Sequence, residues 1–251
     1  MCHDHDSRPP ASPRTGDVVE RGVLTLTSAD GTEFSAAYAA PATEPRVGVV
    51  VLPDVRGLHP YYVALAERFA EAGAATVAID YFGRTAGVCD ASGTRPEDFE
   101  WQAHIPQTTE AAIDGDITAA IGYLRLRTRD DLPVVTVGFC FGGSNSWRQS
   151  GGDLDLAGCV GFYGRPSVVG TAAERAHRPV VMLIAGADAA TPVADQLKLA
   201  DTMRAAGAEV DAVVYDGAPH SFFDRAFGQW EEACRDAWEH VLALTDRVAV
   251  R

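Results

Sequence analysis

The sequence predicts an α/β fold with a mostly parallel central sheet, helices on both faces and an antiparallel hairpin at its N-terminal edge. Short apolar runs alternate with segments of helical periodicity along most of the chain. Most of these runs are continuously apolar, as expected of strands buried on both faces of a parallel sheet. The first two runs instead alternate apolar and polar residues, and they enclose Asp30-Gly31, a dipeptide typical of hairpin turns.

Each element follows from a local pattern. The two hairpin strands are predicted at residues 22–27 and 33–39. The other strands are predicted from apolar runs at 47–52, 75–80, 134–139, 159–163, 180–185 and 210–215. Helices are predicted from apolar residues at helical spacing at 60–74, 109–127, from 141 onward, 192–206 and 224–244.

Two segments lack these patterns. Residues 83–107 show weak periodicity and predict a long irregular loop, of the kind that often covers a functional site. Residues 1–15 are polar and proline-rich and predict a flexible tail, followed by a single α/β domain at 16–251. The tail contains Cys2-His3-Asp4-His5-Asp6, but no ligands at structural spacing follow it, so we expect neither a metal nor a cofactor.

The composition argues against several classes of partner. The 251-residue chain carries a net charge of -14, which disfavours nucleic acid and anionic membranes. No apolar run is long enough to span a membrane, and the first residues lack the pattern of a signal peptide. The five cysteines are irregularly spaced and form no C-x-x-C, which favours reduced thiols in a cytoplasmic protein. An acidic surface fits a monomer or a homodimer equally well.

Cys140 lies in the stretch Gly138-Phe-Cys-Phe-Gly-Gly143, between a predicted strand and a predicted helix. A strand that ends in Gly-x-nucleophile-x-Gly and turns into a helix is the nucleophile elbow of the α/β-hydrolase fold. Asp188 and His220 follow the predicted strands 180–185 and 210–215, in the chain order of that fold. Because the ends of parallel strands share one edge of the sheet, we predict a catalytic triad of these three side chains.

The chemistry needs each of these residue types. A thiolate is the attacking form of Cys140, and His220 can accept its proton while Asp188 holds the imidazole in the required tautomer. The helix that begins at Phe141 points its N-terminus at the sulfur, which lowers the pKa of a thiol. The N–H groups of Phe141 and of Val55, in the loop after strand 47–52, are predicted to form the oxyanion hole.

At these residues the chain resembles the dienelactone hydrolase family, the carboxymethylenebutenolidases. The resemblance rests on the G-x-C-x-G-G elbow at 138–143, on Asp188, and on the stretch from Tyr215 to His220. It implies that an acidic residue after strand 47–52 contacts the resting thiol. Asp54 stands at that place, where the best-known members carry Glu.

The resemblance also implies arginines that hold the carboxylate of a dienelactone. The stretch Asp80-Tyr-Phe-Gly-Arg84 makes Arg84 the first candidate for this role, and Arg56 in the predicted oxyanion loop is a further one. A second family arginine is expected shortly after the histidine, where Arg225 is the nearest. The alternative for each arginine is an ordinary surface ion pair.

The predicted function is hydrolysis of small esters or lactones, dienelactone-like and carrying a carboxylate, through a covalent acyl-enzyme on Cys140. Two alternatives stay open. One is a thioesterase or another acyl hydrolase on the same scaffold, because fold and triad do not fix the substrate. The other is a non-catalytic thiol module, either a ligand-binding relative or a peroxide sensor.

Overall fold

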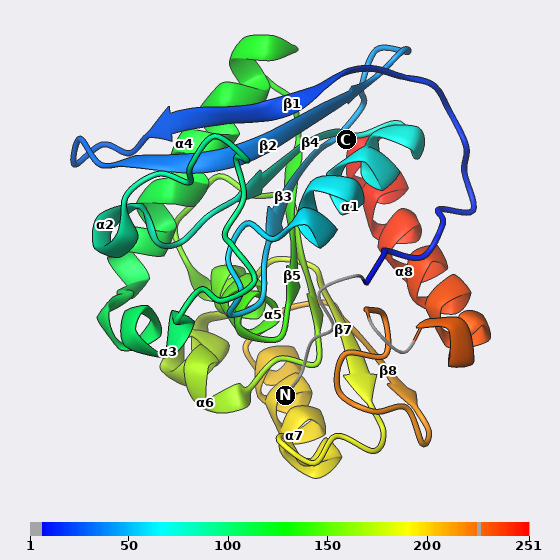
Figure 1. The fold of residues 1–251 in the computed structure, drawn as a ribbon. Helices are drawn as coiled ribbons and strands as arrows, with labels where there is room; N and C mark the ends of the chain where they lie inside the picture. Colours follow the sequence, from blue (N-terminus) through cyan, green and yellow to red (C-terminus); the bar gives the residue numbers. More distant parts are fainter. Residues whose placement is uncertain (1–6, 225–226, 251) are drawn as a thin grey trace.

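The computed structural model describes residues 7–224 and 227–250. Its centre is one eight-stranded sheet with the order β1-β2-β4-β3-β5-β6-β7-β8 (Figure 1). The pairs β1·β2 and β2·β4 are antiparallel, and all later neighbours are parallel. The strands are β1 (Val18–Thr27), β2 (Glu33–Pro41), β3 (Gly48–Leu52), β4 (Ala75–Ile79), β5 (Val134–Phe139), β6 (Gly158–Phe162), β7 (Val180–Ala185) and β8 (Val210–Tyr215). The predicted α/β-hydrolase architecture with an N-terminal edge hairpin is confirmed.

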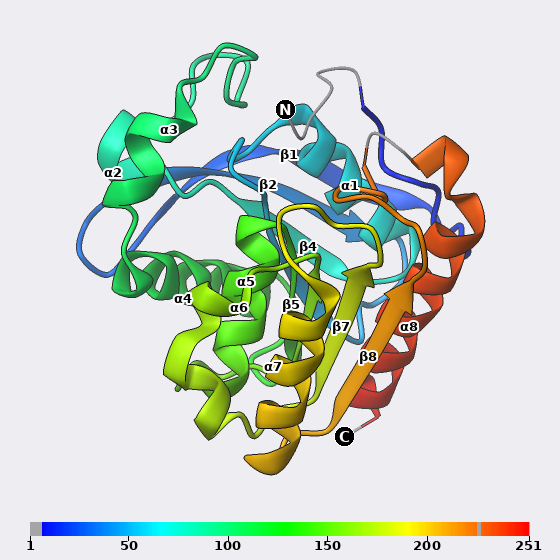
Figure 2. The same ribbon diagram turned by 90° about the horizontal axis from the view of Figure 1, so that it is seen from below.

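Helices cover both faces of the sheet (Figure 2). On one face, α1 (Pro60–Glu71) and α8 (Glu231–Ala249) pack on the largest cluster of buried apolar residues. On the other face lie α4 (Glu110–Arg127), α5 (Phe141–Arg148) and α7 (Val193–Ala205), over two further clusters. The strands β3 to β7 are buried along their whole length, which explains why their sequences are continuously apolar.

The irregular segment 83–107 contains only short helical turns. These are α2 (Gly83–Ala86), α3 (Trp101–His104) and the 3-10 turn Ile105–Gln107. A further one-turn helix, α6 (Pro166–Val169), follows β6, and 3-10 turns lie at Gln149–Gly151, Gly170–Arg175 and Phe227–Gln229. Such short turns give too few apolar repeats to be predicted from periodicity.

The last helix begins later than the sequence predicts. The prediction started it at residue 224, whereas α8 begins at Glu231. Residues 221–224 form turns instead, and Phe222 and Phe223 are fully buried within them. These two apolar residues belong to a turn that packs into the core. In the sequence they resemble the first apolar residues of an amphipathic helix, and the predicted helix therefore began too early.

Residues 7–15, the end of the predicted tail, run along the domain. Ser7 and Ser12 are buried, and Arg14 forms an ion pair of 2.5 Å with Asp246 of α8. The segment from Cys2 to Asp6 lies outside the described residues.

The parallel strands end together at one edge of the sheet. Their register pairs Leu52 with Gly138, Phe139 with Phe162, and Ala185 with Tyr215. The loops that follow β3, β5, β6, β7 and β8 are therefore neighbours, as the triad prediction requires.

Candidate active site

Cys140 sits on a sharp turn between β5 and α5. Its backbone has φ 53° and ψ −108°, a left-handed conformation that is rare for a residue with a side chain. The Cys140 N–H donates to the carbonyl of Phe162 at 3.0 Å, which holds the turn against β6. The thiol is half-buried. This strained strand–turn–helix is the geometry of a nucleophile elbow.

Gly142 lets the start of α5 approach the loop after β3. A Cβ at this position would run into the carbonyl oxygens of Leu52 and Pro53. Any larger residue would therefore push the elbow away from the loop that carries Val55.

Backbone strain gathers at the same edge of the sheet. Among the described non-glycine residues, only Cys140 (φ 53°), Tyr163 (φ 39°) and Ser221 (φ 64°) have positive φ. Cys140 and Tyr163 follow β5 and β6 directly, and Ser221 follows His220 in the loop after β8. Such conformations are costly and cluster at functional sites, so the strain independently marks this edge.

Asp188 and His220 are joined by a hydrogen bond. His220 Nδ1 lies 2.7 Å from Asp188 Oδ2, and the Asp188 side chain is completely buried. The other carboxylate oxygen accepts from the N–H groups of Ala190 and Thr191 at 2.8 Å and 3.3 Å. Burial alone would raise the pKa of Asp188, but these hydrogen bonds and the His220 ring outweigh it and leave the pKa lowered. Because Nδ1 faces the carboxylate, Nε2 is the nitrogen left for proton transfer.

Tyr163 lies beside the candidate triad and was missed from the sequence. Its ring centroid is 4.8 Å from that of His220. The pKa of its hydroxyl is raised well above the ordinary value, chiefly by burial, with smaller contributions from groups that include Asp54 and Cys140. The signal for it was available, because Tyr163 directly follows a buried strand at the edge where the triad was predicted.

The two amides predicted for the oxyanion hole are unused. Within the described part of the chain, neither the Phe141 N–H nor the Val55 N–H donates to any acceptor. The loop that carries Val55 is tied down on both sides. The Asp54 N–H donates to the Tyr62 hydroxyl at 3.0 Å, and the Tyr81 hydroxyl donates to the Pro53 carbonyl at 2.9 Å. Both amides are thus fixed beside the elbow with their donor capacity free.

Arg56 lies within a buried group of three charges. Its backbone N–H and its guanidinium donate to both oxygens of Asp54 at 2.8–3.1 Å, and the guanidinium also pairs with Asp224. All three side chains are at least 92% buried. The guanidinium lies 5.6 Å from the ring centroids of Tyr61 and Tyr62. Within the described residues Arg56 NH1 has no hydrogen-bond partner, but it is buried, so a substrate carboxylate could reach it only by entering this buried group.

This group ties together two loops of the site. Asp54 and Arg56 belong to the loop after β3, and Asp224 to the segment that carries His220 after β8. Burial raises the pKa of Asp224 to about 6, although Arg56 opposes this shift. The sequence could not reveal the Arg56–Asp224 contact, because 168 positions separate the two residues.

Arg84 is also occupied. It pairs with Asp30 in the hairpin turn and, through NH1, with both oxygens of the buried Asp116 on α4, each contact measuring 2.9 Å. These contacts are the ones expected if Arg84 forms ordinary ion pairs within the protein. The role predicted for Arg84 in substrate binding stays a prediction, and Arg225 lies outside the described residues.

A second buried ion pair anchors the irregular segment 83–107 to the site. Arg95 NH2 lies 2.6 Å from Asp80 Oδ2, directly after β4, and both side chains are at least 94% buried. Asp80 also accepts from the N–H of Leu58 in the loop after β3, at 3.1 Å. One carboxylate therefore fixes both the segment 83–107 and the loop that carries Val55.

The family model of the dienelactone hydrolases matches residues 34–248. The chain belongs to the dienelactone hydrolase family. A Salmonella typhi relative, provisionally named a carboxymethylenebutenolidase, is 25% identical over 266 residues, which cover 96% of this chain and 94% of the relative. Carboxymethylenebutenolidase 1 of Cupriavidus pinatubonensis is 28% identical over 144 residues, covering 56% of this chain and 60% of that protein.

Solved structures share the fold. A Klebsiella pneumoniae protein, provisionally described as a dienelactone hydrolase, superposes with a TM-score of 0.73 at 22% identity and covers 90% of this chain and 99% of its own. A dienelactone hydrolase-like promiscuous phosphotriesterase from metagenomic libraries gives a TM-score of 0.74 at 22% identity, covering 92% and 99%. Membership of the dienelactone hydrolase family makes this protein a carboxylic ester hydrolase.

In residues 7–224 and 227–250, no three histidine, cysteine or acidic side chains come together as a set of metal ligands. No helix in the same residues is both long and apolar enough to cross a membrane.

Proposed function

We propose that this dienelactone hydrolase family member hydrolyses small esters or lactones with Cys140 as nucleophile, His220 as general base and acid, and Asp188 as the residue that orients His220. The observation that carries the proposal is the Asp188–His220 hydrogen bond of 2.7 Å at the edge of the sheet where Cys140 occupies a strained elbow. An inert buried cysteine would need neither the strain nor the oriented histidine.

The first half of the reaction forms an acyl-enzyme. His220 Nε2 takes the thiol proton, and the sulfur bonds to the carbonyl carbon while the carbonyl π electrons move to oxygen. The N–H groups of Phe141 and Val55 donate to this oxyanion. When the C=O re-forms, the C–O bond to the leaving group breaks, and the alkoxide takes the proton from His220. In a lactone the released hydroxyl stays attached to the acyl group.

The second half restores the thiol. His220 removes a proton from a water molecule, whose oxygen attacks the thioester carbon of the acyl-enzyme. Collapse of the second oxyanion breaks the C–S bond, and the proton on His220 returns to the sulfur. The products are a carboxylic acid and an alcohol, or a hydroxy acid from a lactone.

We also propose that Asp54 is the acid next to the resting thiol. The carbonyl of Pro53, the residue before Asp54, lies against Gly142 of the elbow, and Tyr81, whose hydroxyl donates to that carbonyl, contacts the ring of Phe141, which supports this assignment. Arg56 holds the Asp54 carboxylate with hydrogen bonds to both its oxygens. An Asp54→Asn variant should change the pH at which Cys140 becomes reactive toward iodoacetamide, whereas an unchanged alkylation profile would remove Asp54 from this role.

A Cys140→Ala variant tests the proposal directly. On a dienelactone and on an activated aryl ester, kcat should fall by several orders of magnitude, because the nucleophile is lost. Cys89→Ala is the matched control, since Cys89 is a half-buried thiol in the segment 83–107. Retention of wild-type turnover by Cys140→Ala would end the proposal.

The two alternatives separate in the same assays. A thioesterase would prefer thioesters over lactones and aryl esters when kcat/KM is compared across all three classes. A thiol sensor or binding module would react stoichiometrically with peroxide or ligand and would release no product from any ester.

A further inference from the structure

Two neighbours of His220 bear on the direction of its ring. The hydrogen bond between Nδ1 and Asp188 Oδ2 holds one point of the imidazole, but a single bond still lets the ring tilt about its axis. The second neighbour is Tyr163, whose ring centroid lies 4.8 Å from that of His220 at an interplanar angle of 54°. Among the rings of the described residues, only that of Tyr163 contacts the imidazole. This contact limits the tilt of the imidazole and so the direction of Nε2.

The loop that carries His220 closes around the Tyr163 ring. Phe222, two residues after His220, packs edge-on against the same tyrosine, with the ring centroids 5.8 Å apart. Ser221 between them has a φ of 64°, a left-handed conformation that is costly for a residue with a side chain. The strained turn therefore places the rings of His220 and Phe222 against one tyrosine, which is only 2% exposed.

Tyr163 is held by the stretch of backbone that also holds Cys140. The Tyr163 N–H donates to the carbonyl of Leu183 on β7 at 2.9 Å. The carbonyl of Phe162, one residue earlier, accepts from the Cys140 N–H at 3.0 Å. Tyr163 has a φ of 39°, so the chain carries a bulky ring at a position where glycine would be unstrained. Two adjacent residues thus set the backbone of the candidate nucleophile and the ring plane of the candidate base.

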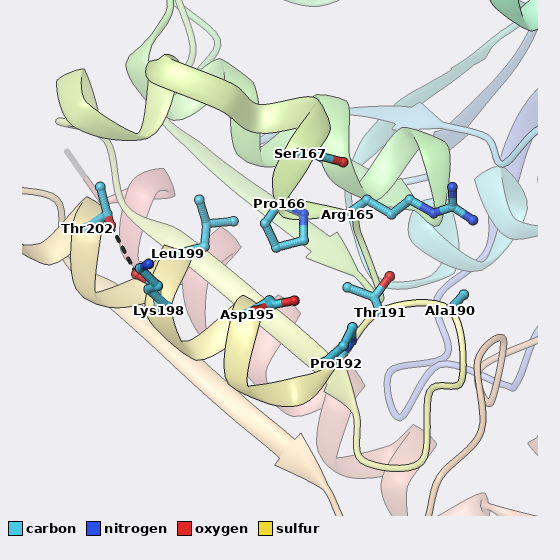
Figure 3. A pocket seen from close by; sticks show the side chains of 10 residues that line it. All are labelled: Arg165, Pro166, Ser167, Ala190, Thr191, Pro192, Asp195, Lys198, Leu199 and Thr202. Carbon is cyan, nitrogen blue, oxygen red and sulfur yellow. Dashed lines mark hydrogen bonds between the residues drawn. The ribbon is translucent and has the colours of Figure 1, made fainter.

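The chain turns away from the triad directly after Tyr163. Figure 3 shows Arg165, Pro166 and Ser167 on the wall of a separate cavity of about 500 Å³ between α6 and α7. No residue of the candidate triad lines this cavity. In the stretch 163–167, it is therefore the Tyr163 ring that meets the imidazole.

We propose that Tyr163 is a positioning residue for His220, whose ring holds the imidazole with Nε2 directed at the sulfur of Cys140. The proposal rests on the proposed function, because it assigns a support to the base of that mechanism. A misdirected general base slows proton transfer without changing how the substrate binds, since proton transfer needs closer alignment than binding does. The effect belongs to the ring and not to the hydroxyl, because the contact joins the two rings.

Three variants test this role on an activated aryl ester. Tyr163→Leu removes the ring but keeps an apolar side chain, and it should lower kcat by about 10- to 100-fold with little change in KM. Tyr163→Phe keeps the ring and should keep kcat within about twofold of the wild-type value. Tyr38→Leu is the matched control, because Tyr38 is a buried tyrosine on β2 that packs on the ring of Tyr123. It should lower stability toward urea and leave kcat unchanged.

A second measurement uses the wild-type protein and does not depend on how Tyr163→Leu folds. With histidine and tyrosine rings isotopically labelled, NMR should find a nuclear Overhauser contact between the ring protons of His220 and Tyr163. The contact is assigned by its loss in Tyr163→Phe, which has no labelled tyrosine at that position. Absence of the contact from the wild type would overturn the role of Tyr163.

The kinetic outcomes separate this role from the function on which it rests. Wild-type kcat in Tyr163→Leu, an equal loss in Tyr163→Phe or in Tyr38→Leu, or a loss carried by KM would each overturn the role of Tyr163 and leave the Cys140 mechanism intact. Turnover by Cys140→Ala at the wild-type rate would instead remove the proposed function, and the role of Tyr163 with it.

Discussion

At the scale of single residues, the site combines strain with burial. Cys140 occupies a left-handed backbone conformation, and Asp188 is completely buried with both oxygens used as acceptors. Each state is costly when considered alone. Together they fix the Cys140 backbone and the His220 imidazole before any substrate binds, as the proposed mechanism requires.

Asp188→Asn tests the orienting role of this carboxylate. The amide keeps the shape of the side chain but can donate to His220 Nδ1 and so favour the wrong tautomer, and kcat should fall by about three to four orders of magnitude. Asp201→Asn on α7 is the control. The carboxylate of Asp201 is exposed, and this substitution should leave kcat unchanged. Wild-type turnover in Asp188→Asn would contradict the triad.

Asp224 should make stability depend on pH in an unusual direction. Its pKa is raised to about 6 in the folded protein, above the ordinary value of 3.8, so the folded state binds its proton more tightly than the unfolded state. Its contribution to stability is therefore present at low pH and is lost as pH rises through 6. Asp188, whose pKa is lowered, loses its contribution only in more acidic solution and does not interfere between pH 5 and 7.

Urea unfolding at pH 5 and pH 7 measures this effect. The change in unfolding free energy between the two pH values should differ by about 1 kcal/mol between wild type and Asp224→Asn. Asp216→Asn, an exposed carboxylate in the same loop, should leave the pH dependence unaltered. An identical pH dependence in Asp224→Asn and wild type would show that Asp224 is already ionised at pH 5.

At the scale of elements, three buried ion pairs in two groups hold the loops around the site. The group of Asp54, Arg56 and Asp224 joins the loops after β3 and β8, and Asp80 with Arg95 joins the loop after β3 to the segment 83–107. The bounds of the strands were predicted to within one or two residues, apart from the longer β1. Most of these strands are buried on both faces, and their sequences are therefore continuously apolar. The ion pairs were not predicted, because they join loops far apart in the sequence and no local pattern records them.

Arg95→Ala tests the anchoring of the segment 83–107. It would leave the fully buried Asp80 carboxylate without its cation, and the protein should lose about 3–5 kcal/mol of unfolding free energy. Limited proteolysis should then cut within 83–107 much faster than in the wild type. Arg129→Ala, which breaks an exposed pair with Asp131, should have no measurable effect. Unchanged proteolysis in Arg95→Ala would mean that other contacts hold the segment.

At the scale of the whole molecule, the sheet brings residues from five loops to one edge. Chain order and strand ends were enough to predict Cys140, Asp188 and His220 as neighbours, and in the structure Asp188 and His220 share a hydrogen bond. The sequence could not say which arginines stay unpaired, because that depends on where every carboxylate lies after folding. Arg56 and Arg84 were candidates for substrate binding in the sequence, and both are paired with carboxylates in the structure.

The thiols of the molecule should differ sharply in reactivity. Burial raises the pKa of Cys159 and of Cys234 to about 12, so both stay protonated at neutral pH. Cys140 is half-exposed at the N-terminus of α5, a position that favours the thiolate. Peptide-resolved mass spectrometry after brief iodoacetamide treatment at pH 7 should find Cys140 labelled before Cys159 and Cys234, which should react only in urea. Labelling of the two buried thiols at the rate of Cys140 would contradict this order.

The central claim is that the acyl group passes through the sulfur of Cys140. Mass spectrometry of protein quenched during turnover of a slowly hydrolysed ester tests it most directly. We predict a mass increase equal to the acyl group, located on the peptide that contains Cys140 and absent from the Cys140→Ala variant. An acyl group on a serine such as Ser144 or Ser221, or steady turnover with no acylated peptide, would contradict the account.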